Sequence, residues 1–147
     1  LLIAGEFYED EKNYHDLLND PAIKSDLITH TNFIADSMVK YYLCAADCVV
    51  QPYRHATQSG VTPLAYHFEV PMIVTNVGGL PSLVPDKKVG LIAEPNAESI
   101  AQKINEYFDL GEGFFLPNLR EEKKKYSWSV MVEEILKLAG AGYNVSF

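Results

Sequence analysis

One segment of the chain, residues 51–63, combines the residue types that a phosphate-binding loop uses. It reads Gln-Pro-Tyr-Arg-His-Ala-Thr-Gln-Ser-Gly-Val-Thr-Pro and joins an expected strand to an expected helix. Thr57, Ser59 and Gly60 are small, so a ligand can approach the backbone closely. Pro63 suits a first helical turn, whose free N–H groups and positive dipole end attract anions. The segment therefore predicts a diphosphate site; an ordinary Ser or Thr N-cap after a polar loop is the alternative.

The predicted diphosphate contacts come from the end of this loop and the start of the helix. They are Thr57, Gln58, Ser59, Gly60, Val61 and Thr62. Arg54 and His55, a few residues earlier, can add positive charge or hydrogen bonds.

A second glycine-containing loop, residues 75–81, follows a continuous apolar strand. Its two glycines allow positive φ angles and a close approach to a ligand, with Gly79 and Leu80 as further donor contacts. A plain tight turn explains the same residues equally well.

Two more strand-to-helix connections, one beginning at Gly5 and one at residue 30, are candidates for binding a nucleobase and its ribose. In an open parallel sheet, ligands bind beyond the carboxyl ends of the strands. Residues 30–34 are polar and then aromatic, so they can hold a base by backbone hydrogen bonds and stacking, or simply connect two elements. The residues expected at the base and ribose are Gly5, Asn32, Phe33, Ile34 and Tyr53.

Short apolar runs alternate with helical segments along the chain. The expected strands are residues 1–4, 27–29, 48–51, 72–75 and 89–92, and the expected helices cover residues 14–18, 36–43, 60–68, 97–108 and 129–138. The alternation implies βαβ units and a parallel sheet in an α/β fold, and the apolar strands indicate that both faces are buried. The inward-facing residues of the last two helices are expected to be Ile100, Ile104, Phe108, Val132, Ile135 and Leu136. Residues 111–118, with Gly, Phe and Pro, are expected to form a loop.

Charge and composition exclude several functions. The net charge of −8 argues against general nucleic-acid binding, which needs Lys and Arg. The basic run at residues 123–125 follows two glutamates and is interpreted as a solvated helix face, with contact to a membrane surface as the alternative. No apolar run approaches a membrane span. Cys44 and Cys48 lack the partners of a zinc site, so buried reduced thiols, a cytoplasmic location, no metal and no cofactor are expected.

Three motifs resemble, in order, those of the C-terminal domain of GT-B glycosyltransferases of family 4. They are Ala-Ala-Asp-Cys-Val-Val-Gln-Pro at 45–52, Pro-Met-Ile-Val-Thr-Asn-Val-Gly-Gly-Leu at 71–80 and Val-Gly-Leu-Ile-Ala-Glu-Pro at 89–95. Tyr-Ser-Trp at 126–128 resembles the opening of that family's closing helix. The resemblance covers nearly the whole chain and implies a Rossmann-like, doubly wound parallel sheet, the C-terminal half of a GT-B fold.

The resemblance also implies a function and a domain organisation. Residues 1–147 would form a single domain that binds a UDP- or GDP-linked sugar, without the N-terminal acceptor-binding domain and without the usual first strand and helix. The full-length protein would be a retaining glycosyltransferase of hexosyltransferase type, which moves the sugar to an acceptor glycan or lipid. It would be cytoplasmic, with peripheral association to the inner face of a membrane as an option. The isolated chain is expected to be inactive.

The sequence departs from the family at three positions. Ala56, Leu64 and Ser82 stand where the family has glutamates, so the usual carboxylate roles are not carried over and the catalytic residues are unassigned. Gln58 and Ser59 can replace part of that hydrogen bonding. A nucleotide-sugar epimerase or phosphorylase of GT-B plan, and a non-catalytic binding domain, therefore remain as alternatives.

Overall fold

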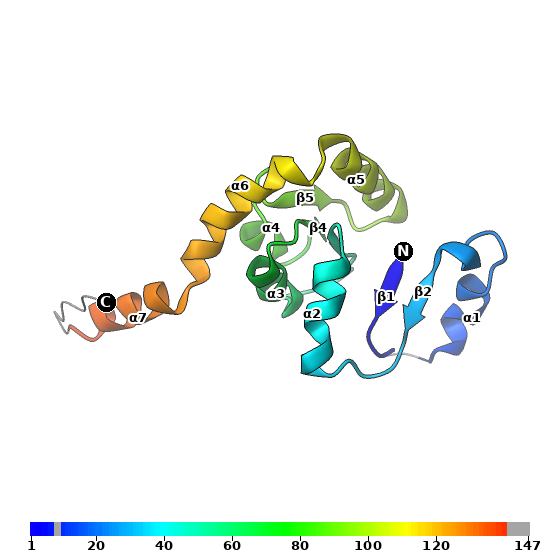
Figure 1. The fold of residues 1–147 in the computed structure, drawn as a ribbon, viewed down its shortest axis with the longest axis horizontal. Coiled ribbons are helices and arrows are strands. Elements are labelled where there is room, and N and C mark those ends of the chain that lie inside the picture. The colour runs from blue at the N-terminus through cyan, green and yellow to red at the C-terminus, as the bar shows by residue number, and fades with distance from the viewer. Residues whose placement is uncertain (8–9, 141–147) are drawn as a thin grey trace. The chain divides into compact units, whose positions relative to one another are not determined.

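The structure is a computed structural model that describes residues 1–7 and 10–140. The chain divides into two compact units, residues 1–42 and residues 43–147 (Figure 1), and each unit is described by itself. None of the helices in the described part of the chain has the length and apolar character needed to cross a membrane.

The first unit contains a two-stranded parallel sheet. Strand β1 (Leu2–Ala4) pairs with β2 (Ile28–His30). Helix α1 (Lys12–Leu18) and the 3-10 helix η1 (Lys24–Asp26) separate the two strands in sequence. Helix α2 (Asp36–Ala45) begins in this unit, where His30 Nδ1 lies 2.7 Å from the Tyr42 hydroxyl and links the end of β2 to the helix.

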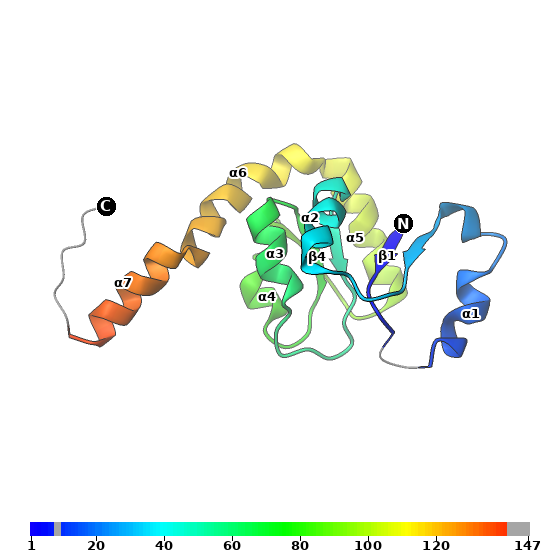
Figure 2. The ribbon, with the colours of Figure 1, turned by 60° about the horizontal axis from the view of Figure 1, so that its bottom comes forward.

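The second unit is built on a three-stranded parallel sheet in the order β3-β4-β5. The strands are β3 (Val49–Gln51), β4 (Met72–Thr75) and β5 (Gly90–Ala93). All four side chains of the central strand β4 are buried, which explains why its sequence is apolar without alternation. Figure 2 shows helices α3 (Val61–Phe68) and α4 (Leu80–Leu83) on one side of this sheet and α5 (Ala97–Leu110) on the other.

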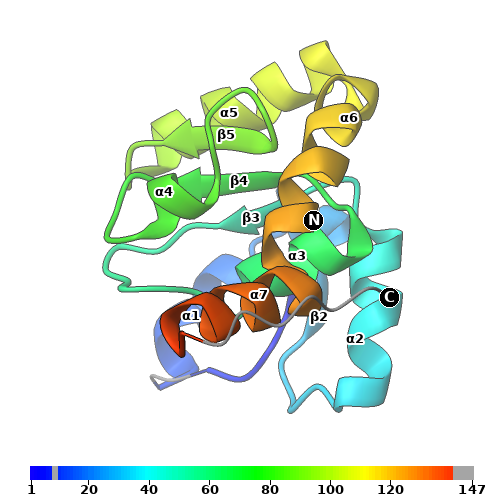
Figure 3. The ribbon, with the colours of Figure 1, turned by 90° about the vertical axis from the view of Figure 1, so that its left-hand side faces the viewer.

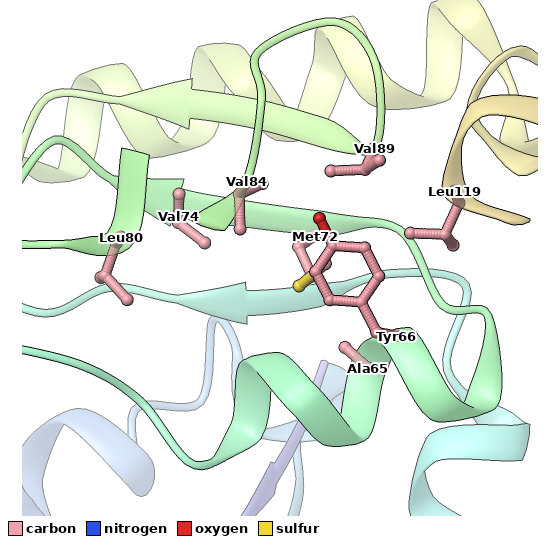
Figure 4. Close-up of a cluster of buried hydrophobic side chains, with 8 residues drawn as sticks. All are labelled: Ala65, Tyr66, Met72, Val74, Leu80, Val84, Val89 and Leu119. Atoms are coloured by element: carbon pink, nitrogen blue, oxygen red, sulfur yellow. The ribbon is translucent and has the colours of Figure 1, made fainter. Parts of the chain in front are cut away.

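Each face of this sheet has its own apolar core because neighbouring residues of a strand point to opposite faces. Met72 and Val74 lie in the first core with Tyr66 of α3 and Leu119 of α6 (Glu112–Lys123), as Figure 4 shows. The second core contains Ile73, Leu91, Tyr107 and Phe115. The predicted α/β fold with parallel strands is confirmed.

Helix α6 corrects one prediction, because residues 111–118 were expected to form a loop. Gly111, at φ 77°, ends α5 and precedes α6. The helix contains Pro117, which supplies no backbone N–H to it. Phe115 and Leu119 are completely buried, and the burial of two large side chains outweighs the missing hydrogen bond. The short helix α4 was also not predicted.

The predicted inward face of α5 is correct at Ile104, which packs against the second core, and wrong at Phe108. Phe108 is 61% exposed, whereas Tyr107 is buried and its hydroxyl donates a hydrogen bond to the carbonyl oxygen of Asp47. Burial raises the pKa of Tyr107, so the phenol keeps the proton that this hydrogen bond needs. A tyrosine can be buried when its hydroxyl has a hydrogen-bond partner, so a prediction from apolar residues alone chose Phe108 in place of Tyr107.

The last helix, α7 (Trp128–Leu138), follows the 3-10 helix η2 (Lys124–Tyr126) and also differs from expectation. Val132 and Ile135 were expected to point inward, but both are exposed, and Leu136 is half-buried. Helical periodicity identifies the apolar face of a helix, but it does not identify what covers that face.

The two cysteines are free thiols. Cys48 is half-buried, whereas Cys44 is exposed, so the expectation of burial is wrong for Cys44.

Candidate functional site

Two loops of the second unit lie at the same edge of its sheet. Residues 52–60 connect β3 to α3, and residues 76–79 connect β4 to α4 (Figure 3). Both loops leave the carboxyl ends of adjacent parallel strands, where α/β sheets bind ligands. The sequence-predicted diphosphate loop and the predicted glycine loop are therefore neighbours.

The two loops are interlocked through their backbones. Gly78 has φ 53°, and a Cβ atom there would lie 1.6 Å from the carbonyl oxygen of Ala56. The N–H of Gly79 donates a hydrogen bond of 3.1 Å to the carbonyl oxygen of Thr57. The glycines are thus explained by contact between the two loops.

Side-chain hydroxyls fix the first loop at both of its ends. Thr75, at the end of β4, donates a 2.6 Å hydrogen bond to the carbonyl oxygen of Tyr53. The Tyr53 hydroxyl lies 3.3 Å from Ser59 Oγ, which also accepts the backbone N–H of Val61 at 3.1 Å. Ser59 is buried, so its side chain serves as a cap inside the protein.

The N-terminus of α3 has a backbone donor at an exposed residue. The first N–H groups of a helix have no partner within the helix. Ser59 accepts that of Val61, Pro63 has none and Thr62 is buried, which leaves the N–H of the exposed Gly60. A Cβ atom on Gly60 would meet nothing within 4 Å, so the space beside this helix end is open.

An open depression of about 620 Å³ lies between the two loops. Its walls are formed by Arg54, His55, Ala56, Thr57, Val77 and Gly78. Arg54 and His55 are exposed, and no carboxylate lines the depression or occurs anywhere from residue 51 to residue 68. Together with the helix N-terminus, this favours an anionic ligand.

The structure brings together some of the predicted donor contacts and turns others inward. Of the predicted diphosphate residues, Thr57 lines the depression with Arg54 and His55, and Gln58 is exposed. Thr62 is buried as a whole residue, at 2% exposure.

In the glycine loop, the backbone N–H groups of Gly79 and Leu80 already have partners within the protein. The Leu80 side chain lies in the core, and the N–H of Leu80 donates to the carbonyl oxygen of Val77. The N–H of Gly79 is occupied by Thr57. The roles of Gly79 and Leu80 toward a ligand stay predictions.

The predicted base-binding residues lie mainly in the first unit. Gly5, at φ 130°, donates its N–H to the carbonyl oxygen of His30, so the ends of β1 and β2 are tied together. Asn32 and Phe33 are exposed, with Phe33 at 72%, and Ile34 is half-buried. Tyr53 lies in the second unit, beside Ser59 as described above. Their role in base binding stays a prediction.

Sequence reasoning missed two residues beneath the site. Gln51 and Thr75 are polar residues that end apolar strands, and both are buried. A polar residue at the last position of a buried strand is the signal that would have identified them. In the part of the chain that the structure describes, no group of three or more His, Cys, Asp or Glu residues is arranged to hold a metal ion.

A sequence model of the family described as "Glycosyl transferases group 1" matches residues 1–109, about three quarters of the chain. The chain belongs to this family, and the predicted resemblance to GT-B group 1 glycosyltransferases is confirmed.

Solved structures agree with this assignment at the level of the fold. Sucrose-phosphate synthase from Thermosynechococcus elongatus matches 95% of this chain with a TM-score of 0.76 and 17% identity, and the match spans 37% of that protein. Anabaena HepE, solved in complex with UDP-glucose, matches 95% of this chain with a TM-score of 0.72 and 16% identity, and the match spans 40% of it. No curated protein matches the sequence. The chain thus spans about two fifths of the length of these structural relatives.

Proposed function

We propose that this chain is the donor-binding part of a retaining glycosyltransferase of hexosyltransferase type, which transfers a sugar from a nucleotide diphosphate to a glycan or lipid acceptor. The observation that carries the proposal is the depression lined by Arg54 and His55 and by no carboxylate, in the loop that leads to the open N-terminus of α3. The binding of UDP-glucose by Anabaena HepE supports a UDP-linked donor.

The chemistry of sugar transfer matches these groups. Positive charge grows on the sugar ring as its bond to the diphosphate breaks, as in glycoside hydrolysis. Negative charge grows on the leaving diphosphate, and the N–H of the exposed Gly60 would stabilise it as it develops. This donor needs no reorganisation because Ser59 and Tyr53 already hold the loop. Arg54 would add a guanidinium, which pairs well with phosphate oxygens.

The remaining features of the proposal concern the whole protein. The chain spans 37% and 40% of the lengths of the two structural relatives, so an acceptor-binding domain N-terminal to this chain is proposed as its partner. A cytoplasmic location is proposed, with peripheral association to the inner face of a membrane when the acceptor is a lipid. Closure of the two halves around the donor would exclude water and limit donor hydrolysis.

Nucleotide binding by the intact protein tests the proposal. Isothermal titration with UDP, GDP, ADP and their sugars should identify one preferred base. Gly60→Val places a branched side chain in the open space at the α3 N-terminus and should weaken binding at least tenfold.

Gly113→Val is the matched control for this experiment. Gly113 lies in α6, is exposed, and also has no atom within 4 Å of its Cβ position. This variant should bind as the parent protein does. Absence of any nucleotide binding, or unchanged binding by Gly60→Val, would overturn the donor-site proposal.

A second function is favoured by one observation, the absence of carboxylates at Ala56, Leu64 and Ser82. Ser82 is exposed and its hydroxyl donates to the carbonyl oxygen of Gly79, so it cannot replace a general base. An epimerase of the same plan would act on the nucleotide-sugar without an acceptor glycan, whereas a phosphorylase would move a glycosyl group from a glycan to inorganic phosphate. Formation of an epimer from the nucleotide-sugar alone, or of a sugar phosphate from a glycan and inorganic phosphate, would select this function over glycosyl transfer.

A further inference from the structure

Gln51 is a buried polar residue at an apolar position of the sheet. It is the last residue of β3, stands opposite Val74 of β4, and is 2% exposed. Its Oε1 accepts a 3.1 Å hydrogen bond from the hydroxyl of Thr62, in the first turn of α3. Its Nε2 has no hydrogen-bond partner among the residues that the structure describes.

This arrangement does not maximise the stability of the fold. A buried amide nitrogen without an acceptor destabilises the native state, and native proteins contain few such groups. Turning the amide over would pair the nitrogen with Thr62 and leave the oxygen without a partner instead. A leucine of similar size would fill the same space among Val74 and its neighbours without an unpaired polar atom.

The contacts of Gln51 lead directly to the anion site. Thr62 lies two residues after the exposed Gly60, in the first turn of α3, and its hydroxyl donates to Gln51. On the neighbouring strand, the Thr75 hydroxyl lies 3.4 Å from the Gln51 carbonyl oxygen and 2.6 Å from that of Tyr53. A layer of three polar side chains, Gln51, Thr62 and Thr75, thus joins the sheet to both ends of the loop.

We propose that Gln51 is a positioning residue, which fixes the first turn of α3 through Thr62 so that the N–H of Gly60 stands ready for the diphosphate. The inference rests on the proposed donor site and adds to it a buried determinant that contacts no ligand. The unpaired amide nitrogen is retained because the amide oxygen orients the binding turn.

Two substitutions in the intact protein break the contact from opposite sides. Gln51→Leu removes the amide and Thr62→Val removes the hydroxyl with little change in shape. Gln51→Leu should bind the preferred nucleotide about fivefold more weakly, the factor that one ordinary hydrogen bond represents. Gln51→Leu also takes the acceptor from the Thr62 hydroxyl, so an unchanged or higher melting temperature is expected only when both substitutions are combined. The double variant should bind no more weakly than Gln51→Leu, because both changes remove one contact.

The rate of amide hydrogen exchange is a second measurement, and it needs no ligand. The N–H of Val61, held by Ser59 at the start of α3, should exchange faster in Gln51→Leu. The amides of α5, which lies on the opposite face of the sheet, should be unchanged. If Gln51→Leu does not fold, Thr62→Val provides the same comparison.

The outcomes separate this inference from the proposed function. Unchanged exchange at Val61 in Gln51→Leu, together with a lower melting temperature of the double variant, would make Gln51 a structural core residue and overturn the inference. Nucleotide binding by the parent protein with equal binding by Gln51→Leu would also overturn it. If the parent protein binds no nucleotide, the donor-site proposal fails, and the exchange of Val61 still decides whether Gln51 positions the turn.

Discussion

Gly78→Ala should disrupt the candidate site and destabilise the second unit. Gly78 has φ 53°, where an alanine costs about 1–2 kcal/mol. Its new Cβ would lie 1.6 Å from the carbonyl oxygen of Ala56 and would have to withdraw to at least 3.0 Å. Since that neighbour is backbone, the loops must separate, and the 3.1 Å hydrogen bond from Gly79 to Thr57 is lost with them.

The magnitude follows from these three contributions. Overpacking costs about 1–3 kcal/mol and the lost hydrogen bond about 1 kcal/mol, so the total is about 3–6 kcal/mol with the strained φ angle. For a chain of this length, that corresponds to a melting temperature lower by about 10 °C or more. Thermal unfolding followed by circular dichroism measures this change.

Gly60→Ala is the comparison that isolates the steric argument. Gly60 has φ −66°, and a Cβ there meets nothing within 4 Å, so its replacement should cost about 1 kcal/mol or less. A Gly78→Ala variant that melts within about 2 °C of the parent would refute the reasoning, because the interlocked loops would then yield at little cost.

Three further predictions concern other parts of the second unit. Gly113→Ala should stabilise the protein by about 0.5–1 kcal/mol, because Gly113 lies inside α6 with open space around it; a loss of stability in urea unfolding would contradict this. Hydrogen bonds from Arg120 and Lys123 of α6 lower the pKa of the Glu69 carboxylate. The carboxylate therefore stabilises the fold at pH values above its unfolded pKa, and this stabilisation is lost as the pH falls through its folded pKa. Glu69→Gln should therefore be less stable than the parent at neutral pH and equal to it in strong acid, and a constant difference at both pH values would argue against the ion pairs. Burial, with a smaller contribution from the Asp47 charge, raises the pKa of Cys48 to about 11, so iodoacetamide at mildly alkaline pH should alkylate Cys44 well before Cys48; mass spectrometry showing equal rates would be evidence against the described burial.

Some elements could be predicted from the sequence because local pattern and tertiary environment agree. Strand β4 (Met72–Thr75) has the predicted bounds, since three apolar residues and a β-branched threonine between Pro71 and Asn76 favour a buried strand. The start of α3 after Gly60 was also predicted from Pro63 and the small residues before it.

Other elements depend on contacts that a single sequence does not display. Phe115 and Leu119 form part of the two cores, and their burial makes a helix of a segment whose Gly and Pro content indicates a loop. Tyr107 replaces Phe108 on the buried side because its hydroxyl finds the carbonyl oxygen of Asp47, 60 residues away.

The candidate site illustrates the same limit. The loop around Ser59 and Gly60 was predicted, yet the partner of Gly78 could not be, because Ala56 lies more than 20 residues earlier. Gln51 stands within an otherwise apolar strand, and only its contact with Thr62 gives it a role.

The exposed N-terminus of α7 determines what the intrinsic fluorescence of this protein reports. The chain contains a single tryptophan, Trp128, whose side chain is 79% exposed at the first residue of that helix. Its emission therefore reports the solvent exposure of the start of α7 and is insensitive to the packing of the two cores. A blue shift of this emission on adding another protein or a lipid surface would report coverage of α7, whereas the melting of the sheet has to be recorded by a signal that comes from the backbone.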